Sequence, residues 1–97
     1  MLAIAENESF VFVEVDQLGQ MTHKDYLPYH VNEVLQLPLV DVEAIKKRNF
    51  TVAIDCVNSV GGLAIPAMLK ALGVTNIIEL YCEPNGQFPH NPEPLPQ

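Results

Sequence analysis

The segment from Phe50 to Cys82 constrains the fold more than any other part of the chain. Two short apolar runs, residues 50–57 and 77–82, flank a helical pattern over residues 63–72 that ends at Gly73. Nearly continuous apolar runs are typical of strands that are covered on both faces. A strand–helix–strand unit of this length forms a parallel, right-handed crossover. The sequence therefore predicts an α/β fold, a three-layer α/β/α domain with a small, mainly parallel sheet.

The residues upstream of this unit predict further local structure. Residues 2–8 are typical of the last turns of a helix, and residues 10–15 of a short extended segment. A helix is expected to start near Asp25, whose carboxylate can cap free amides. A second, shorter helix is expected to start at Asp41 and to end in the basic cluster 46–48, where cations suit the helix dipole.

Length and charge limit the class of protein. With 97 residues, the chain fits one domain, residues 1–97, and 48% of its residues are hydrophobic, enough for a core. A net charge of −7 with five basic residues argues against nucleic acid or an anionic membrane as a partner. No apolar run approaches the roughly 20 residues of a membrane span, and the N-terminus lacks a basic leader. Two cysteines do not make a disulfide framework. We expect a cytoplasmic protein.

Two stretches follow the carboxyl ends of the predicted strands, where ligands of open α/β sheets bind. The first is the loop into the helix N-terminus, with Asn58, Ser59, Gly61 and Gly62. A helix N-terminus can bind an anion. Alternatively, the glycines permit a tight turn and close helix packing, while Asn58 or Ser59 caps the helix. Both interpretations stay open.

The second stretch is the proline-rich loop, residues 83–97. Its prolines stiffen a backbone that presents His90, Asn91 and Glu93. A rigid polar loop at a strand end suits a substrate cleft or a domain interface, although such a loop can also be a plain linker. Because these side chains are expensive to bury without partners, we expect their partners outside this chain, with the loop mobile or held by a neighbouring molecule.

Together the two stretches resemble the second domain of the α-D-phosphohexomutases, the family that includes phosphoglucomutase, phosphomannomutase and phosphoglucosamine mutase. The first resembles a strand ending in D-x-x-N-G-x-G, and the second resembles an F-x-x-H-x-P-[DNE]-P signature with one residue fewer between Phe88 and His90. Ser59 departs from the usual glycine after asparagine, and the second motif is shorter than the common F-P-N-H-H-P-[DN]-P. The matching residues are Asp55, Asn58, Gly61 and Gly62 in the first motif and Phe88, His90, Pro92, Glu93 and Pro94 in the second.

This resemblance implies that the chain is an internal domain of a phosphotransferase that interconverts hexose 1-phosphate and hexose 6-phosphate. The family uses a phosphoserine, which lies in the preceding domain, and Mg²⁺, which is held by a D-x-D-x-D-R loop downstream. Neither motif occurs in this chain. The resemblance therefore places no catalytic residue, metal ligand or cofactor here, and it implies that the chain alone is inactive. The implied partners are the remaining domains and, in the whole enzyme, a phosphorylated hexose.

Two other functions fit the residues: a stand-alone phosphate- or nucleotide-binding α/β module that uses the 58–62 turn, and an interaction domain that uses the proline-rich loop. The resemblance also implies that a further helix and strand complete the sheet. An uncompleted edge beside strand 50–57 or its neighbour invites pairing with another chain. We therefore expect the chain to self-associate.

Overall fold

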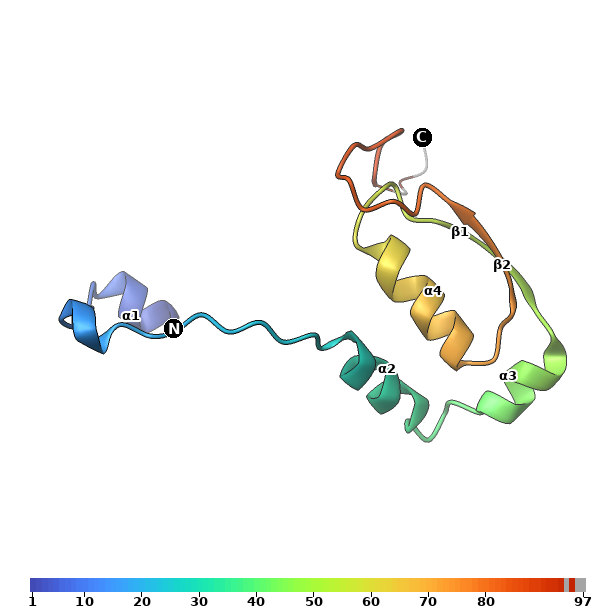
Figure 1. Cartoon of the computed structure of the whole chain (residues 1–97), viewed down its shortest axis with the longest axis horizontal. Helices are drawn as coiled ribbons and strands as arrows, with labels where there is room; N and C mark the ends of the chain where they lie inside the picture. Colours follow the sequence, from blue (N-terminus) through green and yellow to red (C-terminus); the bar gives the residue numbers. More distant parts are fainter. Residues whose placement is uncertain (94, 96–97) are drawn as a thin grey trace.

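The computed structural model describes residues 1–93 and 95. The chain forms an N-terminal arm and an α/β body (Figure 1). The elements in order are α1 (Leu2–Glu6), the 3-10 turn η1 (Val15–Gln17), α2 (Leu27–Leu35), α3 (Val42–Arg48), β1 (Thr51–Asp55), α4 (Gly61–Ala71) and β2 (Asn76–Leu80).

The body is built on β1 and β2, which pair in parallel with α4 as their crossover. The register runs from Thr51 opposite Asn76 to Asp55 opposite Leu80. The α/β class and the small parallel sheet are confirmed. Each strand is shorter than predicted, because the backbone turns left-handed close behind it. The φ value is 44° at Val57, just after β1, and 49° at Tyr81, directly after β2.

Close contact between α4 and the end of β2 depends on a glycine. A Cβ atom at Gly62 would lie 2.2 Å from the carbonyl oxygen of Cys82, so the helix could not approach this closely with a side chain there. The interpretation of Gly62 as a close-packing residue is confirmed. The predicted cap is wrong, because the N-cap residue is Val60 and no side chain caps α4. The helix also begins two residues earlier than expected, so Gly61 and Gly62 belong to its first turn.

The sheet is covered on one face within the described residues. Along β1, exposed and half-buried residues alternate, with Val52 and Ile54 on the covered side. On the other face Ile78 and Leu80 of β2 remain about half exposed. The prediction that both faces are covered is therefore not met by the described part of the chain. Its buried hydrophobic residues are Cys56 and Val74, which are 7% and 4% exposed.

The N-terminal arm, residues 1–25, extends away from the body in Figure 1. The predicted extended segment at residues 10–15 is not paired as a strand, and its end, Val15, begins η1. Phe10 and Phe12 are exposed and contact each other. The radius of gyration is 19.9 Å, whereas a compact chain of this length has about 13 Å. α2 is the first element that contacts the body, through α4.

These exposed surfaces lead to the first prediction. In sedimentation, the chain is expected to form dimers or larger species as its concentration rises, through the free edges or the open face of the β1–β2 pair. Replacing Ile78 by Lys puts a charge on that face and should weaken association at least about tenfold, because burying such a side chain contributes about 1.5–3 kcal/mol.

The matched control is Val11→Lys, which places the same charge on an exposed residue of the arm. That substitution should leave association unchanged. A chain that stays monomeric at high concentration would contradict the prediction, and so would a larger effect of Val11→Lys than of Ile78→Lys.

Candidate functional site

The site lies where the carboxyl ends of β1 and β2 meet. Asn58 joins the turn after β1 to the loop after β2. Its amide donates to the carbonyl of Tyr81 at 2.6 Å, and its carbonyl accepts from the amide of Gly86 at 3.0 Å. Its side-chain Nδ2 donates to the carbonyl of Gln87 at 3.0 Å. The backbone carbonyl and the side-chain amide of Asn58 therefore attach the start of the proline-rich loop to this turn, and its backbone amide attaches the residue that follows β2.

Left-handed backbone conformations gather at the same point. Val57, Asn58 and Tyr81 have φ values of 44°, 54° and 49°. Asparagine tolerates this region, whereas a β-branched valine rarely enters it. Such conformations cost about 1–3 kcal/mol each and concentrate at functional sites. Part of the stabilisation comes from Asp55, whose Oδ1 accepts from the Val57 amide at 3.0 Å.

The second carboxylate oxygen of Asp55 holds the far half of the proline-rich loop. Oδ2 lies 2.9 Å from Nε2 of His90, a residue 35 positions later in the chain. The other ring nitrogen, Nδ1, lies 2.9 Å from the carbonyl oxygen of Asn91. The ring edge also meets Tyr81, with ring centroids 5.8 Å apart and planes at 71°. One carboxylate thus supports both the strained turn and the loop.

These contacts shift two ionisable groups in opposite directions. The Val57 amide and then the His90 ring lower the pKa of Asp55 below its ordinary value. The Asn91 carbonyl and then the Asp55 carboxylate raise the pKa of His90 above its ordinary value. The two side chains keep 38% and 47% of their exposure, so they remain reachable from solvent. The arrangement favours a carboxylate paired with an imidazolium.

The structure brings His90, Asn91 and Glu93 together around one hollow of about 380 Å³, whose other lining residues are Asp55, Val57 and Pro92. The expectation that these side chains lack partners within the chain is wrong for His90 and Asn91. His90 is held as described, and Oδ1 of Asn91 accepts from the Glu93 amide at 3.0 Å.

Sequence reasoning missed Asp55 and Tyr81 as members of this cluster. Asp55 belonged to the quoted motif, but no local pattern connects it to His90. The signal that could have found them is position, because each residue directly follows or ends one of two neighbouring parallel strands.

Four of the six backbone amides of residues 57–62 are already bonded within the chain. The Val57 and Asn58 amides are bonded as described, and the Ser59 amide donates to the Cys56 carbonyl. The Gly62 amide donates to the Ser59 carbonyl at 3.0 Å. A phosphate site needs amides that point at the ligand, and within residues 57–62 these bonds leave that role to the Val60 and Gly61 amides. Asn58 and Gly62 organise the fold here, and Ser59 supplies a turn carbonyl.

The two cysteines lie under the start of α4 and are free. Burial, followed by a contact with the Cys82 thiol, raises the pKa of the Cys56 thiol to about 11. A thiol that stays protonated at neutral pH is a poor nucleophile and a poor metal ligand. Cys56 is therefore a packing residue beneath the site.

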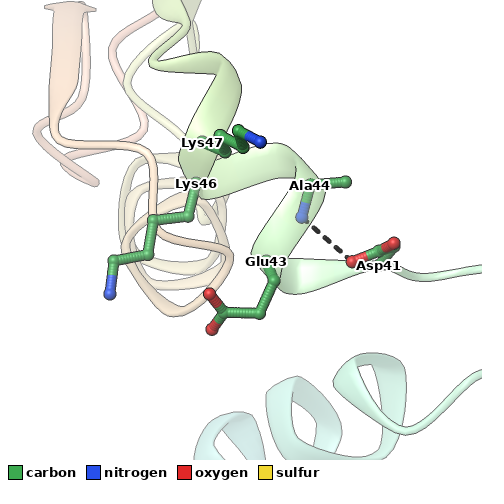
Figure 2. Close-up of a pocket in the computed structure, with 5 residues that line it drawn as sticks. All are labelled: Asp41, Glu43, Ala44, Lys46 and Lys47. Carbon is green, nitrogen blue, oxygen red and sulfur yellow. Dashed lines mark hydrogen bonds between the residues drawn. The ribbon is translucent and has the colours of Figure 1, made fainter.

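A second hollow, of about 510 Å³, lies on α3 and is lined by Asp41, Glu43, Ala44, Lys46 and Lys47 (Figure 2). As predicted, Asp41 caps this helix, and its Oδ1 accepts from the Ala44 amide at 2.9 Å. The helix leads directly into β1, so this hollow lies at the amino end of the sheet. Ligands of α/β sheets bind at the opposite end, and the hollow does not extend the candidate site.

Within residues 1–93 and 95, no group of three or more His, Cys, Asp or Glu side chains is placed to hold a metal ion. The Asp55–His90 cluster does not fit Mg²⁺, which prefers oxygen ligands in octahedral geometry, because one carboxylate oxygen is bonded to an amide and the other to the imidazole. Across the same described residues, no helix combines the length and the apolar character needed to span a bilayer.

Comparison with known proteins gives a consistent result. Residues 28–97 match the sequence model of a domain family described as phosphoglucomutase/phosphomannomutase, alpha/beta/alpha domain II. The match begins at α2 and leaves the N-terminal arm outside. No solved structure matches the chain significantly.

Curated relatives match over most of this chain and a small part of their own length. A phosphoglucomutase/phosphomannomutase of Thermococcus kodakarensis is 34% identical over 91% of this chain and 19% of its own. A phosphoglucomutase of Neisseria gonorrhoeae is 38% identical over 97% of this chain and 19% of its own. A probable phosphoglucosamine mutase of Methanococcoides burtonii is 33% identical over 92% and 19%. The chain thus spans about a fifth of these relatives.

Proposed function

The chain belongs to the phosphoglucomutase/phosphomannomutase alpha/beta/alpha domain II family, and we propose that it serves as the second domain of a phosphohexomutase. The whole enzyme would move a phosphoryl group between C1 and C6 of a hexose, through a phosphoserine and with Mg²⁺. The observation that carries the proposal is that the family match spans residues 28–97 and that the relatives named above are mutases about five times as long as the matched segment.

In this proposal the chain contributes a wall of the substrate cleft or a domain interface, and no reacting group. His90, Asn91 and Glu93 line a hollow at the carboxyl ends of the strands, where α/β ligand sites gather. The phosphoserine and the Mg²⁺ ligands would come from other segments of the enzyme. Phosphoryl transfer depends mainly on positioning and electrostatic stabilisation, so a well-placed wall contributes to the rate without touching the phosphorus.

The partners in this proposal are the remaining domains of the enzyme and a phosphorylated hexose, and the location is the cytoplasm. Ile78 and Leu80 on the open face of the sheet are about half exposed. We place the contact with the further helix and strand of the whole enzyme on this face. The alternatives have less support. Four of the six amides of residues 57–62 are already bonded, which leaves fewer for a phosphate- or nucleotide-binding module. The long relatives favour an enzyme domain over an independent interaction module.

The reading frame around this chain tests the proposal. We expect it to encode a T-x-S-H-type serine loop upstream of residue 1 and a D-x-D-x-D-R loop downstream of residue 97. A frame that lacks both loops would overturn the proposal. Calorimetry with a nucleoside triphosphate then tests the alternative function, a nucleotide-binding module. Saturable binding by the chain would favour that module, and the absence of binding would count against it.

A further inference from the structure

His90 faces an acceptor at each ring nitrogen. Nε2 points at the carboxylate of Asp55 and Nδ1 at the carbonyl of Asn91, each at 2.9 Å. Neither oxygen can donate a proton, because Asp55 is ionised and a backbone carbonyl only accepts. The ring must therefore supply both hydrogen atoms.

A neutral imidazole carries one N–H and cannot satisfy this geometry. Whichever tautomer forms, the second nitrogen would direct a lone pair at an oxygen 2.9 Å away. The imidazolium donates from both nitrogens, and its charge strengthens the bond to the carboxylate. The contacts of His90 thus select the doubly protonated ring.

We propose that His90 is a positioning residue, whose doubly protonated ring clasps the far half of the proline-rich loop to Asp55 at the end of β1. This clasp goes beyond the proposed function and does not depend on it, because every group involved belongs to this chain. It adds to the anchor at Asn58, which holds Gly86 and Gln87 by separate bonds. Opening the clasp would release Asn91 and Glu93 while the start of the loop stays attached.

The surroundings fix the sign of the pH dependence. The titratable groups that face His90 are Asp55 at the end of β1, Tyr81 at the end of β2 and Glu93 in the loop. The pKa of His90 is raised above its ordinary 6.5, so its contribution is fully present below 6.5 and is lost as the pH rises through the raised pKa.

The pKa of Asp55 is lowered below its ordinary 3.8. Its contribution is therefore present above 3.8 and is lost as the pH falls through the lowered pKa. The clasp is closed between the two shifted pKa values and opens on either side of that window.

Nitrogen-15 NMR of the full chain tests the clasp directly. At pH 6.5 an ordinary imidazole is protonated in half of the molecules. We expect the His90 ring to carry hydrogen on both nitrogens in more than half of them. As the pH is raised through the His90 titration, the amide signals of Asn91 and Glu93 should shift with the same midpoint, while the Gly86 amide should not follow it. A singly protonated ring at pH 6.5 would overturn the proposal.

Asp55→Asn separates the two tasks of this carboxylate. The asparagine oxygen still accepts from the Val57 amide, so the turn is kept, but the amide nitrogen in place of Oδ2 cannot accept from His90. The His90 midpoint should move down relative to the wild type. Glu93→Gln is the matched control, because it removes a nearby carboxylate that forms no bond with the ring. An unchanged His90 midpoint in Asp55→Asn, or an equal shift in Glu93→Gln, would refute the clasp.

Discussion

Replacing Gly62 by Ala is expected to destabilise the chain by about 2 kcal/mol or more, the range for forcing an extra carbon into a packed site. The added Cβ would lie 2.2 Å from the carbonyl oxygen and 2.8 Å from the Cα of Cys82, so α4 would have to move away from the end of β2. The neighbours are backbone atoms and cannot rotate aside. For a domain of this size the loss corresponds to a fall in Tm of roughly 10 °C.

Gly61→Ala is the matched control, one residue earlier in the same turn of α4. A Cβ there would meet Cβ and Sγ of Cys56 at 3.6 Å, an ordinary contact. Since alanine favours a helix over glycine by up to about 1 kcal/mol, this variant should be as stable as the wild type or slightly more stable. Thermal unfolding of both variants, followed by circular dichroism at one protein concentration, measures the difference. Equal Tm values would contradict the packing described for Gly62.

The α/β unit could be predicted from the sequence because its signals are local. Each apolar run, the helical spacing between them and Gly73 at the helix end act over a few residues, and the right-handed crossover then leaves one topology. Gly73 indeed adopts φ 83° after α4. The cap at Asp41 was equally local and was confirmed. The start of α4 was misplaced because its N-cap residue is Val60, which no capping rule favours.

The candidate site could be predicted only in outline. The polar loop at the strand ends was visible, but the bond between Asp55 and His90 joins residues 35 positions apart, and no periodicity carries that information. The left-handed turn at Val57 was also invisible, because valine is a poor residue for that conformation. Its stabilisation comes from Asp55 and from the bonds of Asn58 to the loop, which exist only after folding.

The second large effect concerns activity. Under the proposed function, the chain alone shows no conversion of glucose 1-phosphate or mannose 1-phosphate, whereas a whole phosphohexomutase that contains it as its second domain is active. The reason is chemical: phosphoryl transfer needs a group that accepts the phosphoryl and charges that stabilise it in transit. The described residues hold no cluster of metal-binding side chains, Cys56 stays protonated at neutral pH, since burial raises its pKa to about 11, and His90 is engaged by Asp55.

The control for this prediction is a longer protein in which the serine of the proposed upstream loop is replaced by alanine. That variant should lose activity while it keeps this domain intact, which separates loss of chemistry from loss of folding. Within the longer protein, Gly62→Ala should lower activity by disturbing the wall that α4 supports, and Gly61→Ala should not.

The most direct measurement of the central claim is an assay of hexose 1-phosphate conversion by the purified chain beside the longer protein, with each sample freed of host mutase. The account predicts turnover by the longer protein and none by residues 1–97. Turnover by the chain itself, in proportion to its concentration, would contradict the claim that it is one domain of a larger mutase, and so would a longer protein that binds hexose phosphates but never converts them.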